Sequence, residues 1–350
     1  MWNELKRNKL ALAALFILAL LYLAAIFAGF FSPYRYDDGS IAYRWAPPAK
    51  IHFINVEKKI FYPYIYGYKV KIDKYYRCIY SEDRSKIYPV RFFVKGFKYK
   101  VLGIFSVNRH LFGVPGTRIY MLGADLKGRD ILSRLIYGAR ISLSIGIIGV
   151  AISFIIGIII GGISGYFGGW VDNINMRVVE MIMMVPGFYL MLALRASFPP
   201  NFSSAQVYFL IVVILSFIGW ASIARVIRGM ALSLKEREFV LAAKAVGLSD
   251  FKIIIRHILP HTFSYAIVAA FLSIPGYIIG EAALSLLGLG IQEPQASWGN
   301  MLALAQGIVN IKLYPWVLAP GIIIIITTSC FNIVGEALRD ALDPKRKVFQ

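Results

Sequence analysis

The sequence predicts an all-α polytopic membrane protein with six transmembrane helices. Of its 350 residues, 58% are hydrophobic, and the mean hydropathy is +0.63. A helix that crosses the ~30 Å hydrocarbon core of a bilayer needs about 20 apolar residues, because backbone groups in lipid must be bonded within the protein. Six apolar runs have this length, at residues 10–31, 141–163, 178–198, 205–227, 262–290 and 315–338.

The first apolar run is expected to be an uncleaved transmembrane anchor at residues 1–33. Its basic start, with Lys6, Arg7 and Lys9, is also typical of a signal peptide. The run is too long, however, for a signal core of about 7–15 residues, and Phe30–Pro33 offers no small-residue cleavage site.

The distribution of Lys and Arg predicts that both termini lie in the cytoplasm. Positive residues gather before the first run, in the loop at 225–256 and in the tail, which we place at 345–350. The loop at 196–204 is uncharged, and 291–314 carries only Glu293 and Lys312. Because cytoplasmic loops carry the excess of positive charge, we expect a multi-pass protein of the plasma membrane, in contact with lipid.

Residues 34–120 are expected to form a small β-rich extracytoplasmic insert between helices 1 and 2. Short alternating runs of aromatic and β-branched residues favour strands there, with a hairpin turn at Val94–Phe97. Residues 32–140 hold 21 Lys and Arg against 8 Asp and Glu. Long loops translocate largely regardless of charge. No nucleic-acid-binding module accompanies the charge, so nucleic acid is not expected as a partner.

The other five runs form a predicted five-helix core at 121–344. Just before the second run, Asp125, Arg129 and Asp130 are expected to form an ion-pair cluster that fixes a turn. The second run carries a ladder of small residues, which in a membrane allows another helix backbone to approach closely. The ladder consists of Gly149, Ser153, Gly157, Gly161, Gly165 and Gly169.

A basic cytoplasmic loop at 228–260 separates the fourth and fifth runs. Helix formers from Lys235 to Val246 predict a short amphipathic helix. Gly247 is placed to end that helix as a left-handed cap, and a second helix follows. Pro260 is expected to block the straightforward continuation of the second helix.

The small residues Ala242, Ala243 and Gly247 leave a smooth surface that fits a groove in another protein, and Leu259–Pro260 follows after a fixed gap. This pattern resembles the coupling loop of importer-type ABC transporter permeases, which reads Glu-Ala-Ala, three residues, Gly, nine residues, Ile-x-Leu-Pro. Leu241 replaces the Glu and His257 replaces the Ile. Further segments, at 123–146, 281–302 and 335–344, look like the second permease subunit of dipeptide/oligopeptide/nickel-type importers.

The resemblance implies an importer-type permease fold and a transport subunit that is not an enzyme. Such a subunit forms a translocation pathway with a second homologous permease, couples to two ATP-binding cassette subunits and receives substrate from an extracytoplasmic solute-binding protein. The chain contains no GxxxxGK[ST] phosphate loop, so ATP is expected on the partner subunits and no cofactor on this chain. The implied ATPase-coupling residues are Ala242, Ala243, Gly247, Leu259 and Pro260.

The expected substrate is a peptide or an oligosaccharide, and nickel is least favoured because no His or Cys cluster lies at membrane depth. Glu281 and Trp298 are candidates for the pathway or for the contact between permeases. Glu281 is ionisable at membrane depth, although a structural hydrogen bond explains it equally well, and Trp298 suits a membrane-interface anchor. His257 and His261 have metal-ligand spacing, but Pro260 disturbs the helix between them, so no metal site is expected.

Two other classes of protein compete with this interpretation. A secondary carrier or channel would need no ATPase partners, but it predicts an internal repeat or an intramembrane charge relay. A membrane enzyme with its site in the insert predicts clustered acid and base groups. The sequence shows none of these features clearly, and the ABC permease remains the favoured hypothesis.

Overall fold

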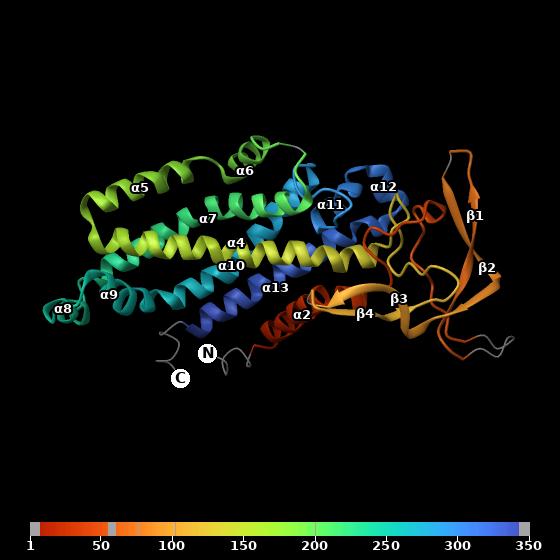
Figure 1. Ribbon diagram of the computed structural model, residues 1–350, viewed down its shortest axis with the longest axis horizontal. Coiled ribbons are helices and arrows are strands. Elements are labelled where there is room, and N and C mark those ends of the chain that lie inside the picture. Colours follow the sequence, from red (N-terminus) through yellow and green to blue (C-terminus); the bar gives the residue numbers. More distant parts are fainter. Residues whose placement is uncertain (1–7, 55–60, 76, 102, 200, 343–350) are drawn as a thin grey trace. The chain divides into compact units, whose positions relative to one another are not determined.

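The computed structural model describes residues 8–54, 61–75, 77–101, 103–199 and 201–342, so the expected tail and the basic residues Lys6 and Arg7 lie outside it. Figure 1 shows a mostly helical chain with two β-hairpins. The longer helices are α2 (Lys9–Ile26), α4 (Ile131–Phe167), α5 (Gly169–Met184), α6 (Gly187–Ala196), α7 (Ser204–Leu234), α10 (Leu259–Leu286) and α13 (Ala319–Leu342).

The described chain divides into two compact units. The helical unit combines the chain up to Leu18 with Ser144–Leu284 and the chain from Ile326. The hairpin unit combines Ala19–Leu143 with Ser285–Ile325. The predicted segments 1–33, 34–120 and 121–344 cut the chain differently, and their boundaries stay predictions.

Five helical segments of the described chain are long and apolar enough to cross a membrane. They correspond to five of the six predicted runs and are Lys9–Ile26, Ile131–Phe167, Ser204–Leu234, Asp250–Leu286 and Pro315–Leu342. The sixth run, 178–198, is not one straight helix, because α5 and α6 are bent by 88°. Val185, which precedes Pro186, has extended backbone angles, as expected of a residue whose helical conformation a following proline disfavours. The described chain therefore has five candidate spans, or six if the bent pair counts as one.

Small residues bring α4 and α7 together within the helical unit. A side-chain carbon placed on Gly157 would lie 2.7 Å from Ile223. One placed on Gly161 would lie 2.5 Å from the carbonyl oxygen of Ala224, and one placed on Gly165 would lie 2.5 Å from that of Arg228. The hydroxyl of Ser153 donates to the carbonyl of Ser216 at 3.1 Å, and the Ser216 hydroxyl donates to the carbonyl of Gly149 at 3.1 Å. The predicted ladder thus packs helices from Gly149 to Gly165.

Gly169 does not belong to this ladder, because it begins α5 and has no neighbouring heavy atom in the space where a side chain would lie. α7 in turn contacts α5 and α6. Figure 1 shows α4, α5 and α7 running side by side, with α10 (teal) behind them.

The insert contains two separate antiparallel hairpins of the hairpin unit. β1 (Tyr64–Ile72) pairs with β2 (Cys78–Pro89), and β3 (Arg91–Val101) pairs with β4 (Phe105–Gly113). The β-rich content was predicted correctly, but the turn predicted at Val94–Phe97 is wrong. Those residues lie inside β3, with Val94 opposite His110 and Lys95 opposite Arg109, and the chain reverses next to Gly103.

Replacing Gly161 with alanine tests the α4–α7 contact. Because the added carbon meets a backbone oxygen that cannot rotate away, we expect Gly161→Ala to destabilise the protein by about 1–3 kcal/mol. Gly276→Ala is the matched control, since Gly276 in α10 has open space around it, and alanine there should leave stability unchanged or raise it by up to about 1 kcal/mol. Thermal unfolding in detergent compares the two variants, and equal midpoints would contradict the close contact.

Candidate functional site

The coupling segment, defined here as residues 228–260, contains the end of α7, one short helix and, after a tight turn, the start of the helix that runs from Asp250 to Leu286. α8 (Glu238–Ala245) begins with an acidic residue, which the positive end of a helix favours. At its other end Leu248 N–H donates to the carbonyl of Ala243 at 3.2 Å, and Gly247 N–H donates to that of Lys244 at 3.0 Å. This pair of bonds is a Schellman motif, which needs a left-handed residue where Gly247 has a φ of 83°. The predicted cap at Gly247 is confirmed.

One face of α8 holds this segment onto the helical unit. Val240 and Ala243 are buried in a cluster with Ala231, Ile253 and Ile258, and Leu248 packs against the cluster. The hydroxyl of Tyr166, near the end of α4, donates to the carboxylate of Asp250 at 2.5 Å, where α9 (Asp250–Ile253) begins. Ala243 therefore supports the turn from inside the chain.

The opposite face of the coupling segment is apolar and exposed. Leu241, Val246 and Phe251 are 54%, 83% and 69% exposed, and Ala242 and Gly247 are also exposed. We call Leu241, Ala242, Val246, Gly247 and Phe251 the apolar apex. Exposed apolar surfaces on ordered segments typically mark contacts with another protein.

Pro260 was expected to block a straightforward continuation of the second helix, and the helix reaches α10 (Leu259–Leu286) through an irregular turn. The chain continues as a helix from Asp250 to Leu286, with a π-helical turn at Ile254–Ile258. Leu259 N–H donates to the carbonyl of Ile254, five residues earlier. The wider turn accommodates the proline ring, which would clash with a carbonyl in a regular α-helix. Leu259 is half-buried and approaches Gly162 of α4, whereas Pro260 is exposed.

The two histidines beside Pro260 form no metal site with their neighbours. Among the described residues, no group of three or more His, Cys, Asp or Glu side chains could hold a metal ion. The ring of His261 instead packs against that of Phe239, with centroids 4.9 Å apart.

Glu281 and Trp298, the two pathway candidates, are both fully buried. Glu281 lies in α10 within the helical unit. Trp298 begins α11 (Trp298–Leu302) in the hairpin unit, where its indole N–H donates to the carbonyl of Leu135 at 3.0 Å. Its backbone N–H donates to the hydroxyl of Ser142 at 3.2 Å. Trp298 therefore supports its segment from inside and is not exposed as an interface anchor would be. The pathway roles of both residues stay predictions.

The helical unit also contains an apolar cavity of about 450 Å³ between α4, α6, α7 and α10. Gly276, Tyr277 and Gly280 of α10 line it, and Glu281 does not. Its wall carries few polar groups, with Ser222 and Ser273 among them.

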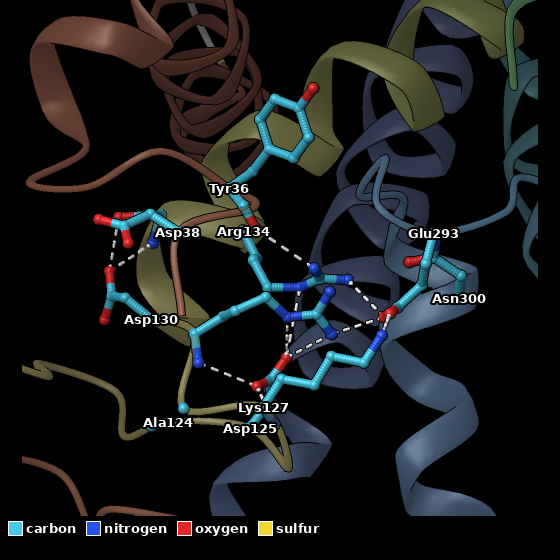
Figure 2. Close-up of polar contacts among 12 residues, drawn as sticks. Tyr36, Asp38, Ala124, Asp125, Lys127, Asp130, Arg134, Glu293 and Asn300 are labelled. Carbon is cyan, nitrogen blue, oxygen red and sulfur yellow. Dashed lines mark hydrogen bonds and ion pairs between the residues drawn. The ribbon is translucent and has the colours of Figure 1, made fainter. Parts of the chain in front are cut away.

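The hairpin unit contains a partly buried ion network (Figure 2), in which Asp125, Arg129 and Arg134 are buried and Lys127 and Glu293 are exposed. Arg129 Nε donates to Asp125 at 2.7 Å, and Arg129 Nη2 donates to Glu293 at 2.5 Å. Lys127 and Arg134 also pair with Glu293. Asp125 accepts backbone N–H bonds from Lys127 and Arg129 at 2.8 and 3.0 Å, which fixes the turn. The network thus ties the segment before α4 to the loop that follows α10.

Glu293 is the acidic partner in this network that the sequence did not indicate. Partial burial would raise the pKa of Glu293, but hydrogen bonds from Arg129 and Lys127, together with the charges of Arg129 and Arg134, lower it to about 2. Glu293 lies 164 residues from Arg129, so no local pattern connects them. One feature of the sequence could have pointed to Glu293 as a partner for a cation: it is the only acidic residue in the predicted loop 291–314.

Asp130 was expected in the cluster but has another role. Its Oδ2 accepts hydrogen bonds from the Ser133 N–H at 2.8 Å and from the Ser133 hydroxyl at 2.6 Å, and so caps α4. Its Oδ1 is buried without a hydrogen-bond partner in the described chain. Burial raises the pKa of Asp130 to about 6, against the opposing effect of the Ser133 bonds. Only the Asp125–Arg129 part of the predicted cluster is confirmed.

Comparison with known proteins decides the family. The family described as "Binding-protein-dependent transport system inner membrane component" matches residues 153–348. The chain belongs to this family. Residues 1–48 also match the family described as "N-terminal TM domain of oligopeptide transport permease C". A member of the family is a non-catalytic, multi-pass component of the inner membrane that works with other ABC transporter subunits.

The curated relatives include peptide permeases. The oligopeptide transport system permease protein OppC of Haemophilus influenzae is 43% identical over 227 residues, covering 65% of this chain and 70% of the relative. The dipeptide transport system permease protein DppC of Bacillus subtilis is 33% identical over 346 residues, covering 98% and 84%. Among solved structures, a chain of the MetNI methionine ABC transporter has a TM-score of 0.46 at 17% identity, covering 60% of this chain and 96% of that chain.

Asp130→Asn should change how the stability of this permease depends on pH. The pKa of Asp130 is higher in the folded protein, at about 6, than the ordinary 3.8, so the folded state holds the extra proton between these values. Stability should therefore fall as pH rises from 4 to about 6, by on the order of 3 kcal/mol. Asparagine cannot titrate, and its oxygen can still accept from Ser133, so the variant should lose this dependence.

Asp125→Asn is the contrasting variant, because it removes the charge that faces Arg129. It should lower stability by about 3–5 kcal/mol at every pH from 5 to 8. Thermal unfolding across this range measures both variants. If the stability of Asp130→Asn depends on pH as strongly as that of the wild type, the raised pKa of Asp130 is contradicted.

Proposed function

We propose that this chain is the permease subunit of an ATP-driven, binding-protein-dependent importer of peptides. With a second homologous permease it forms the translocation pathway. Two ATP-binding cassette subunits hydrolyse ATP, an extracytoplasmic solute-binding protein delivers the substrate, and the chain itself needs no cofactor. The family membership supports this proposal, and the names of the relatives, oligopeptide and dipeptide permeases, favour peptides over oligosaccharides.

The proposal includes six spans with both termini in the cytoplasm. The bent pair α5 and α6 then counts as one broken span. The supporting observation is charge: the coupling segment and its flanks carry Arg225, Arg228, Lys235, Arg237, Lys244, Lys252 and Arg256, and the positive charge of short loops marks the cytoplasmic side. In this proposed orientation the insert lies outside the cell.

The apolar apex is the observation that carries the coupling role. Its side chains project from a turn that is fixed by a Schellman motif, a buried cluster and the Tyr166–Asp250 bond. A segment with fixed shape can transmit displacement, whereas a mobile loop would absorb it. We infer that Ala242 and Gly247 contact the ATPase directly, that Ala243 holds the turn from below, and that Leu259 and Pro260 connect the turn to the fifth span.

The apolar cavity between α4, α6, α7 and α10 is the proposed part of the pathway within this chain. Peptides differ in their side chains, so a wall with few fixed polar groups avoids strong preference for one sequence. The alternative, a secondary carrier or channel without ATPase partners, would leave the apolar apex without a partner to cover it.

Val246→Asp tests the docking role. Val246 is 83% exposed, so aspartate should not disturb folding of the chain. In the complex it would place a charge in an apolar contact, and a loss of 1.4 kcal/mol or more weakens association about tenfold or more. We expect the ATPase subunits to co-purify poorly with this variant and substrate-stimulated ATP hydrolysis to fall by a similar factor.

Val309→Asp is the matched control, since Val309 in α12 (Ile308–Leu313) is 67% exposed and lies on the opposite side in the proposed orientation. Its complex should retain the ATPase subunits. Normal recovery of those subunits with Val246→Asp would overturn the docking role. Full transport by the chain without any ATPase would favour a carrier.

A further inference from the structure

The β3–β4 hairpin is unusual in its charge. It carries Arg91, Lys95, Lys98, Lys100 and Arg109 but no acidic residue. None of these five cations takes part in an ion pair within the described residues, whereas the β1–β2 hairpin pairs Lys69 with Asp83 and Arg77 with Asp73. The first hairpin neutralises part of its charge internally, and the second leaves its charge available to a partner.

The β3–β4 hairpin is fixed to the end of the first apolar helix. α3 (Ala28–Phe31) follows α2 directly and contacts both strands. His110 Nδ1 lies 2.7 Å from the carbonyl oxygen of Gly29 and 2.9 Å from that of Ser32. The rings of Phe30 and Phe93 have centroids 6.2 Å apart. Figure 1 shows the hairpin beside this end of α2.

The end of α2 has the features of a helix end at a membrane surface. α2 is an apolar helix of 18 residues that ends at Ile26. There Arg140 donates from Nε to the carbonyl of Ala25 at 2.6 Å and from Nη2 to the carbonyl of Ile26 at 2.9 Å. A cation on the last carbonyls complements the helix dipole, and a guanidinium is expensive in hydrocarbon. Arg140 therefore marks the level of the lipid headgroups.

The hairpin runs back from α3 toward this level. Phe93 contacts Phe30, and Tyr99, further along β3, lies against Gly29. From Tyr99, which lies beside Gly29, the strand continues at about 3.3 Å per residue. The tip of the hairpin therefore lies roughly 10 Å from Gly29 along the strand. At that tip, Ile104 and Phe105 are 74% and 66% exposed. Because side chains alternate along a strand, Lys98 and Lys100 flank Tyr99 on the exposed face.

We propose that the β3–β4 hairpin binds the surface of the membrane that α2 spans. Ile104 and Phe105 enter the layer between headgroups and acyl chains, while Lys98, Lys100 and Arg109 contact the phosphates of anionic lipids. Basic segments with exposed apolar residues bind membranes in this way. The inference rests on α2 as a membrane helix and holds on either side of the membrane, so it does not depend on the docking of an ATPase.

A cysteine at position 104 tests the depth of the tip. In a Cys78→Ser, Cys330→Ser background, Ile104→Cys is labelled with an environment-sensitive fluorophore, and the full chain is placed in nanodiscs of phosphatidylglycerol and phosphatidylcholine. Ile72→Cys is the matched control, because Ile72 is a 66% exposed isoleucine at the end of β1. We expect a lipid-chain quencher to quench the label at position 104, and a water-soluble quencher to quench the label at position 72.

Charge reversal tests the phosphate contacts. Lys98→Glu with Lys100→Glu should lower the ratio of lipid-inserted to water-exposed label at position 104 by on the order of tenfold in anionic nanodiscs. The pair Lys71→Glu and Lys74→Glu, on the other hairpin, should leave that ratio unchanged.

Two results would overturn the proposal. In the first, the label at position 104 is as accessible to water as the label at position 72 in anionic nanodiscs. In the second, the label is shielded only after a solute-binding protein is added, which would assign the cationic hairpin to an acidic protein surface.

Discussion

The close approach of α4 to its neighbours is the contact on which the helical unit depends. Apolar side chains gain little from leaving lipid for a helix interface, so helices in a membrane associate through close packing and hydrogen bonds. Gly157, Gly161 and Gly165 allow α7 to lie against the backbone of α4. Gly149 and Gly162 of the same helix meet Tyr277 and Leu259 of α10. The helices on either side of the coupling segment, α7 and α10, therefore both pack against α4.

Local chemistry made several features predictable from the sequence. Five of the six apolar runs correspond to single candidate spans because hydropathy and length suffice to identify them. Gly247 was predictable as a cap because a left-handed residue after a helix favours glycine. The effect of a proline on a helix could not be predicted in this way. Pro275 stays inside α10, Pro260 follows a π-turn, and Pro186 accompanies an 88° bend. The surrounding tertiary contacts decide among these outcomes, and no local pattern reports them.

Buried polar contacts were less predictable because they join distant residues. The pairing of Asp125 with Arg129 was predictable because the two residues are only four positions apart. The pairing of Arg129 with Glu293 was not, because no local pattern connects them. Trp298 looked like a residue for the membrane interface because of its type and position, whereas its indole is enclosed by the hairpin unit. A tryptophan suits either environment when its N–H finds an acceptor, and only the fold shows which environment it occupies.

The unbroken helix from Asp250 to Leu286 has a mechanical consequence. Its 37 residues correspond to about 55 Å of helix, roughly 25 Å more than the hydrocarbon core of a bilayer. Part of the helix must therefore project beyond the lipid. A force applied to that projecting end tilts the whole helix, because the helix is continuous. A small displacement outside the bilayer therefore also moves the part of the helix that packs against the other spans.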